Sequence, residues 1–139
     1  MNPTNLLRIT SGLTLFHAML HTIGAVFSKA QPGAMEATLA IMKANEFQLM
    51  GNTRTYWNLY LGLNLFVTVA LTAEAIVFWQ LGELAKSEAY RLRPILVTFL
   101  LAYCCYAVVA FTCFFIPPAA FELLIAATLA WTIAKSVKS

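Results

Sequence analysis

The sequence contains no aspartate, and charged residues make up only 11% of its 139 residues. Soluble domains carry about 25% charged residues, so this chain has too little charge to cover a surface of ordinary polarity in water. Hydrophobic residues reach 60%, which indicates an integral membrane protein. The net charge of +3 is small and scattered, and this excludes the dense basic patch of a nucleic-acid-binding protein.

Motifs that would identify a reaction are also missing. The chain has no GxSxG nucleophile elbow, no phosphate-binding loop and no dinucleotide-binding fingerprint. Cys104, Cys105 and Cys113 lie in one apolar run without CxxC spacing. We therefore expect these cysteines to be core or lipid-facing residues rather than a redox pair or a zinc site.

Four apolar runs are long enough to be membrane-spanning helices, which need about 20 mostly apolar residues. They cover residues 6–27, 56–81, 95–116 and, more briefly, 119–136. Asn52 or Thr53 is expected to cap the second helix, and Pro117-Pro118 separates the third helix from the fourth. The sequence therefore predicts an all-α fold, a four-helix transmembrane bundle that forms a single domain over residues 1–139.

The only sizeable loop joins the first two spans, and its segment from Ala34 to Met50 is amphipathic. Apolar side chains gather on one side of this segment, and Glu36 and Lys43 lie on the other. We expect an amphipathic helix lying in the membrane interface over the outer mouth of the bundle. The apolar side consists of Met35, Leu39, Met42 and Leu49.

The distribution of lysine and arginine predicts the orientation, because these residues favour cytoplasmic loops. With both termini in the cytoplasm, six basic residues lie inside and three lie outside. The inner six are Arg8, Lys86, Arg91, Arg93, Lys135 and Lys138, and the outer three are Lys29, Lys43 and Arg54.

The first apolar run also has features of a signal peptide, because Ser28-Lys29-Ala30 would allow cleavage after Ala30. However, the run is longer than the 7 to 15 apolar residues, roughly, of a signal peptide, and it contains two histidines. We therefore expect it to remain as the first span.

Polar residues within the spans are the candidates for function, since they are costly in a bilayer unless they have partners. On the first helix, steps of three and four residues place His17 and His21 on one face with Thr10, Thr14 and Gly24. That face should point away from lipid and into the bundle.

Other helices place polar groups at the same depth in the membrane. The second helix carries Trp57, Tyr60 and Asn64 along one stripe, with Asn58 beside it, and Glu122 lies at the start of the fourth helix. These groups and the two histidines all map to the outer half of the bundle. We therefore predict a polar pocket in the outer leaflet.

The residue types indicate roles in this pocket. His17 and His21 would carry protons as catalytic residues and Glu122 would be their counter-charge. The remaining residues would bind a ligand: Asn58, Tyr60 and Asn64 with polar groups, together with Trp57 and Arg54. The alternative is that these residues only join helices by hydrogen bonds or form an aromatic belt.

Two charged residues need partners. Arg54 in the first helical turn would oppose the helix dipole, and Glu122 at the same level is its expected partner. Glu74 lies near the inner end of its helix, where Arg8, Arg91 or Arg93 could form an ion pair with it.

Metal or haem binding is a further alternative. His17 and His21 have the HxxxH spacing by which one helix supplies two metal ligands, and Glu122 could be a third. Histidines four residues apart lie on one face, so they cannot occupy the two opposite axial positions of one haem. A haem with one axial histidine, or one shared between two chains, remains open.

Two stretches resemble a group of bacterial proteins. LHTIGAVF, residues 20–27, and MGNTRTYWNLYLG, residues 50–62, resemble small four-helix inner-membrane proteins of the DoxX-like group. The resemblance implies a multi-pass protein of the bacterial inner membrane. It implies no active site.

Together these features predict a membrane protein that binds a small lipophilic molecule, with or without chemistry on it. The main alternative is an accessory subunit of a membrane complex, in which the polar residues serve packing. A lipid, a partner subunit or a second copy of the chain could be the partner, the last because Gly12, Ala18 and Gly24 would allow close helix contact.

Overall fold

The computed structural model describes residues 1–27 and 29–136, and these are mostly α-helical. Ser28 and Lys138, which entered the signal-peptide and orientation arguments, lie outside the described residues. The chain divides into two compact units. Unit 1 contains residues 1–17 and 71–136, and unit 2 contains Ala18–Ala70. The division falls within two long helices, α1 (Pro3–Thr22) and α3 (Tyr56–Glu88).

Three stretches of helix in the described part of the chain are long and apolar enough to cross a membrane. They are Pro3–Phe27, Tyr56–Cys113 and Ile116–Lys135. The middle stretch contains two α-helices, α3 (Tyr56–Glu88) and α4 (Arg93–Cys113), which are joined by the 3-10 turn η2 (Ala89–Leu92). The prediction of an all-α membrane protein is therefore confirmed at the level of helix length and composition.

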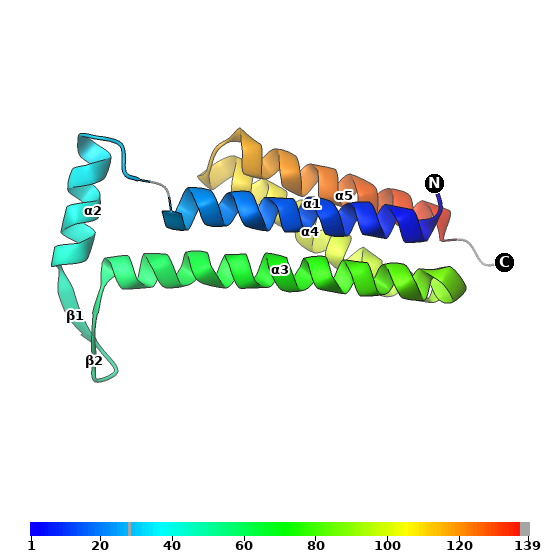
Figure 1. The fold of residues 1–139 in the computed structure, drawn as a ribbon, viewed down its shortest axis with the longest axis horizontal. Coiled ribbons are helices and arrows are strands. Elements are labelled where there is room, and N and C mark those ends of the chain that lie inside the picture. Colours follow the sequence, from blue (N-terminus) through cyan, green and yellow to red (C-terminus); the bar gives the residue numbers. More distant parts are fainter. Residues whose placement is uncertain (28, 137–139) are drawn as a thin grey trace. The chain divides into compact units, whose positions relative to one another are not determined.

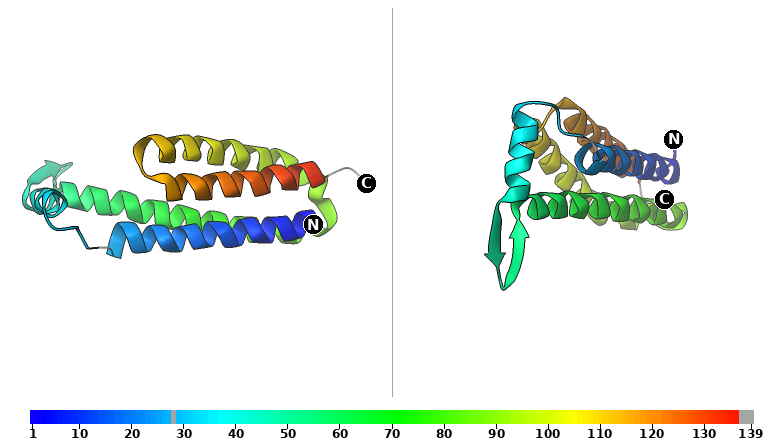
Figure 2. Two further views of the ribbon diagram at one scale, coloured as in Figure 1. Left: turned by 90° about the horizontal axis from the view of Figure 1, so that it is seen from above. Right: turned by 60° about the vertical axis from the view of Figure 1, so that its left-hand side comes forward.

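Unit 1 is built from α1 (Pro3–Thr22) up to His17, the part of α3 after Ala70, α4 and α5 (Ile116–Lys135). Helices α4 and α5 lie side by side as an antiparallel pair (Figures 1 and 2). The predicted boundary between them was wrong, because α4 ends at Cys113 and Pro117 and Pro118 lie inside the first turn of α5. Proline suits that position, since the first helical N–H groups have no partner within the helix.

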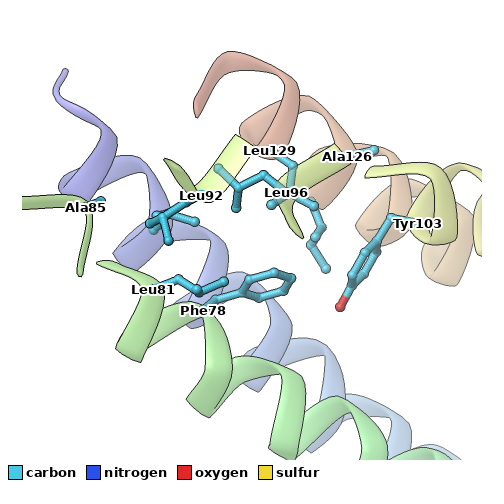
Figure 3. Close-up of a cluster of buried hydrophobic side chains, with 10 residues drawn as sticks. Phe78, Leu81, Ala85, Leu92, Leu96, Tyr103, Ala126 and Leu129 are labelled. Atoms are coloured by element: carbon cyan, nitrogen blue, oxygen red, sulfur yellow. The ribbon is translucent and has the colours of Figure 1, made fainter. Parts of the chain in front are cut away.

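All four helices contribute to the core of unit 1 (Figure 3). Phe78 packs against Phe99 with ring centroids 4.8 Å apart, and Tyr103 lies at one end of the cluster. Small residues are frequent on the buried faces, as expected of helices packed in a membrane. The buried alanines are Ala18, Ala75, Ala85, Ala107, Ala110, Ala119 and Ala126, of which Ala18 belongs to unit 2.

Unit 2 contains the end of α1, the π-helical segment η1 (Ile23–Phe27), α2 (Ala34–Ala44) and the first part of α3. The helix predicted from Ala34 to Met50 is shorter than expected, because strands β1 (Glu46–Leu49) and β2 (Asn52–Thr55) follow it as an antiparallel hairpin.

Two residues close this hairpin. Leu49 pairs with Asn52 across the turn, so the loop consists of Met50 and Gly51, with φ angles of 49° and 81°. Positive φ at both positions is the pattern of the tight turns that suit the twist of two-residue hairpins. The glycine permits this geometry without a steric penalty.

The hairpin also changes how α3 begins. Thr55, rather than Asn52 or Thr53, caps the helix: the Asn58 backbone N–H donates to Thr55 Oγ1 at 3.2 Å, and the Thr55 N–H donates to Asn58 Oδ1 at 2.9 Å. This reciprocal pair satisfies two backbone donors, as a capping box does. Asn58, predicted to bind a ligand, thus has a structural role at the helix start.

We predict that Gly51→Val weakens the hairpin, because a left-handed backbone costs an L-residue roughly 1–2 kcal/mol and a β-branched one more. Hydrogen exchange of the amides in β1 and β2 should become at least about fivefold faster. Gly62→Ala is the matched control, since a Cβ at Gly62 would meet nothing within 4 Å. Equal exchange in the two variants would contradict the assigned turn.

Candidate functional site

Helix α1 lines the interior of unit 1 with polar side chains. Thr10 and Thr14 are fully buried, and Ser11 and His17 are nearly so. Thr10 Oγ1 lies 2.8 Å from Thr128 Oγ1 of α5, and the Ser11 hydroxyl donates to the Ala75 carbonyl of α3 at 2.7 Å. The structure therefore buries the predicted polar face of α1 against two neighbouring helices.

His17 and Glu122 are in contact at one end of this buried polar face of α1. His17 Nδ1 lies 3.5 Å from Glu122 Oε1, and each side chain is only 9% exposed. The Phe121 ring stacks on the imidazole, with centroids 5.2 Å apart and planes 16° apart, which covers one face of the imidazole. Glu122 Oε2 is buried with no hydrogen-bond partner among the described residues.

A second pair lies in the same unit. The fully buried Tyr103 of α4 donates its hydroxyl proton to Glu74 Oε2 of α3, at 2.5 Å. The carboxyl groups of Glu74 and Glu122 are near enough to interact electrostatically. Both carboxyl groups also interact electrostatically with the Tyr103 hydroxyl. Unit 1 thus gathers four ionisable side chains from four helices.

The sequence did not identify this second pair. Glu74 was expected to pair with Arg8, Arg91 or Arg93, and that was wrong: Arg8 pairs with Glu83 at 2.5 Å, and Arg91 lies nearest Glu88. Tyr103 went unnoticed because a lone tyrosine in an apolar run is common. Its spacing of four residues from Phe99 and from Ala107, both core-facing, is the signal that places it inside.

The other predicted site residues belong to unit 2. His21 Nε2 lies 3.2 Å from the Asn64 carbonyl oxygen, and the Asn64 side chain donates back to the Tyr60 carbonyl at 2.8 Å. These contacts join helices or stabilise one helix, and they use backbone oxygens. The His21 contact is the kind of interhelical hydrogen bond that was the alternative to a pocket.

Arg54 differs from its prediction. It lies in β2 rather than in a helical turn, so it does not oppose the dipole of α3, and its guanidinium donates to the Thr53 carbonyl at 2.8 Å. Among the described ion pairs, Glu122 is joined to His17 and none contains Arg54. The expected pairing of Arg54 with Glu122 is therefore not observed.

Unit 2 contains a cavity of about 410 Å³. It lies between α2, η1 and the start of α3, and its lining includes Met35, Leu39 and Met42 of α2 together with Trp57 and Tyr60 of α3. Its volume is in the range of about 300–1,000 Å³ that small-molecule pockets occupy. The remaining lining residues are Gly24, Ala25, Ala30, Ala34 and Thr38.

Two aromatic side chains form one wall of this cavity. Trp57 and Tyr60 stack with centroids 5.5 Å apart, and Lys43 Nζ lies 5.0 Å from the centre of the Trp57 ring. Both aromatic residues were predicted to bind a ligand, whereas Asn58, Asn64 and Arg54 are not among the lining residues. The apolar residues predicted for one side of the amphipathic segment supply much of the lining.

The arrangement does not favour a metal. Within the described residues, no three histidine, cysteine, aspartate or glutamate side chains lie where they could hold one ion. His17, His21 and Glu122 therefore do not form a ligand set for one metal ion in this structure.

Comparisons with protein-family models, with curated proteins and with solved structures give no match. The resemblance to the DoxX-like group therefore stays a prediction.

We predict that Tyr103→Phe destabilises the protein by about 1–3 kcal/mol, because it removes a hydrogen bond from a partly buried carboxyl group. The matched control is Tyr106→Phe on the same helix, whose side chain is 45% exposed and which should change stability little. Unfolding in detergent measures both. Adding Glu74→Leu to Tyr103→Phe should recover part of the loss, since it removes the carboxyl left without its partner. Equal effects of the two tyrosine substitutions would contradict the assigned interaction.

Proposed function

We propose that this chain is a four-span protein of the bacterial inner membrane that binds a small lipophilic molecule in the cavity of unit 2. The observation that carries the proposal is that cavity, which is largely apolar and has a pair of stacked aromatic rings in its wall. The bacterial location rests on the resemblance to the DoxX-like group.

Four spans require α3 and α4 to cross the membrane separately. Helix α3 has 33 residues and α4 has 21, so at 1.5 Å per residue they are about 50 Å and 31 Å long. Each is long enough for a hydrocarbon core of about 30 Å. The turn η2 and Pro94 at the start of α4 allow the chain to reverse between them. The bias of lysine and arginine then favours cytoplasmic termini.

With this orientation, unit 2 contains the loop on the outer side. Helix α2 would lie in the interface, with its methionines and Leu39 toward the cavity and with Lys43 near the headgroups. Methionine side chains are flexible and adapt to irregular apolar ligands. Aromatic rings at the interface suit a molecule with one apolar part and one polar end. These features support a lipid-like ligand rather than a water-soluble one.

Leu39→Trp is the test of this proposal, because it should fill the cavity without removing its wall. Apolar molecules that co-purify with the protein are extracted and measured by mass spectrometry. We expect at least a roughly tenfold loss of the retained molecule, which corresponds to about 1.4 kcal/mol in binding.

Trp131→Ala is the control, since Trp131 lies on α5 and is 49% exposed. It should retain the molecule at the wild-type level. Equal retention by Leu39→Trp and Trp131→Ala, or the same molecules in all samples at the level of the detergent blank, would contradict the proposal. Either result would favour the accessory-subunit alternative.

A further inference from the structure

Unit 1 contains a cluster of ionisable side chains that the cavity of unit 2 does not use. His17 comes from α1, Glu74 from α3, Tyr103 from α4 and Glu122 from α5. We refer to these four residues as the buried cluster. The His17–Glu122 contact of 3.5 Å and the Tyr103–Glu74 hydrogen bond of 2.5 Å divide it into two pairs.

The charge that the buried cluster would carry favours the binding of a proton. With neutral imidazole and phenol groups and two ionised carboxylates, the cluster would carry two negative charges. Ionised groups in an apolar interior are strongly disfavoured, and they bind a proton rather than remain charged. Two carboxylates that interact with each other add to this tendency, because ionisation of one disfavours ionisation of the other.

The surroundings of the Glu122 carboxyl group indicate where a proton would bind. Its Oε1 faces His17, whereas its Oε2 is buried with no hydrogen-bond partner among the described residues, and the side chain is 9% exposed. No lysine or arginine is paired with it in the described structure. A carboxylate in this setting lacks compensation for one of its oxygens, and a bound proton supplies it.

We propose that the buried cluster is an intramembrane proton-binding site centred on His17 and Glu122, with Tyr103 and Glu74 as its second pair. Uptake of one proton from water forms an N–H bond on the imidazole or an O–H bond on the carboxyl group. Transfer within the pair breaks the bond between His17 Nδ1 and the proton and forms the bond to Glu122 Oε1, with no change in net charge. Ionisable groups buried in membrane helices serve proton relays in this way.

Among the described residues, the other titratable side chains that interact near the cluster are Tyr106 and Cys105 of α4. Tyr106 of α4 also senses the charges of Glu74 and Glu122, and it is 45% exposed. Within the buried cluster, α1 contributes the basic side chain, His17, and α5 contributes Glu122. The intramembrane position rests on the proposed four spans, whereas proton binding does not, so the two can fail separately.

Infrared spectroscopy of the purified protein in an ester-free detergent tests the proposal, with the proton itself as the probe. The chain has no aspartate, and its other glutamates, Glu36, Glu46, Glu83 and Glu88, are exposed. A carboxyl group that keeps its proton at neutral pH is a consequence of burial away from water. A carbonyl stretching band of a protonated carboxyl group at neutral pH would therefore come from Glu74 or Glu122.

We expect the wild-type protein to show this band, and ¹³C-labelled glutamate should shift it. Glu122→Gln should remove or clearly weaken the band, whereas the control Glu83→Gln should leave it unchanged. His17→Gln should retain a band but change its frequency or its pH dependence, because Glu122 then loses its basic neighbour.

Absence from the labelled wild-type protein, between about pH 5 and 8, of both the carboxyl band and the bands of a protonated imidazole would overturn the proposal. This measurement needs no variant to fold. A band that survives unchanged in Glu122→Gln, with helical content preserved, would overturn the central role of Glu122. A band unchanged in His17→Gln would overturn the assignment of a shared proton.

Discussion

The contact between His17 and Glu122 is the constraint on which the arrangement of unit 1 depends. Both side chains are almost fully buried, and removing one partner would leave the other without compensation in an apolar interior. The contact therefore fixes how α1 is rotated against α5. The same face of α1 then makes two further contacts. Thr10 contacts Thr128 of α5, and Ser11 forms a hydrogen bond with Ala75 of α3. The apolar cluster around Phe78 contains side chains from all four helices of unit 1.

Unit 2 is organised by backbone geometry rather than by buried charge. The positive φ angles of Met50 and Gly51 close the hairpin, and the pairing of Thr55 with Asn58 starts α3 immediately after it. This places Trp57 and Tyr60 in the first turns of α3, where they line the cavity with α2. The apolar side of α2 thus has a partner surface within its own unit.

The sequence predicted the features that depend on composition and helical period. Apolar runs located the long helices, and steps of three and four residues placed Thr10, Thr14 and His17 on a buried face. It failed on the hairpin, because the amphipathic pattern from Ala34 to Met50 was extended through strands that follow α2 after Ala44. It also failed on the hydrogen bond between Tyr103 and Glu74, which joins residues on different helices whose proximity no local pattern specifies. Arg54 was predicted to lie in the first turn of a helix, and this was wrong because it belongs to strand β2 of the hairpin.

Topology mapping tests most directly whether four helices cross the membrane with their polar side chains inside. Reporter fusions that are active only on one side of the membrane would be placed after Met42, Lys86 and Lys135. Our account predicts that the fusions after Lys86 and Lys135 report the cytoplasm and that the one after Met42 reports the outside. A fusion after Lys135 that reports the outside, or one after Lys86 on the same side as Met42, would contradict it.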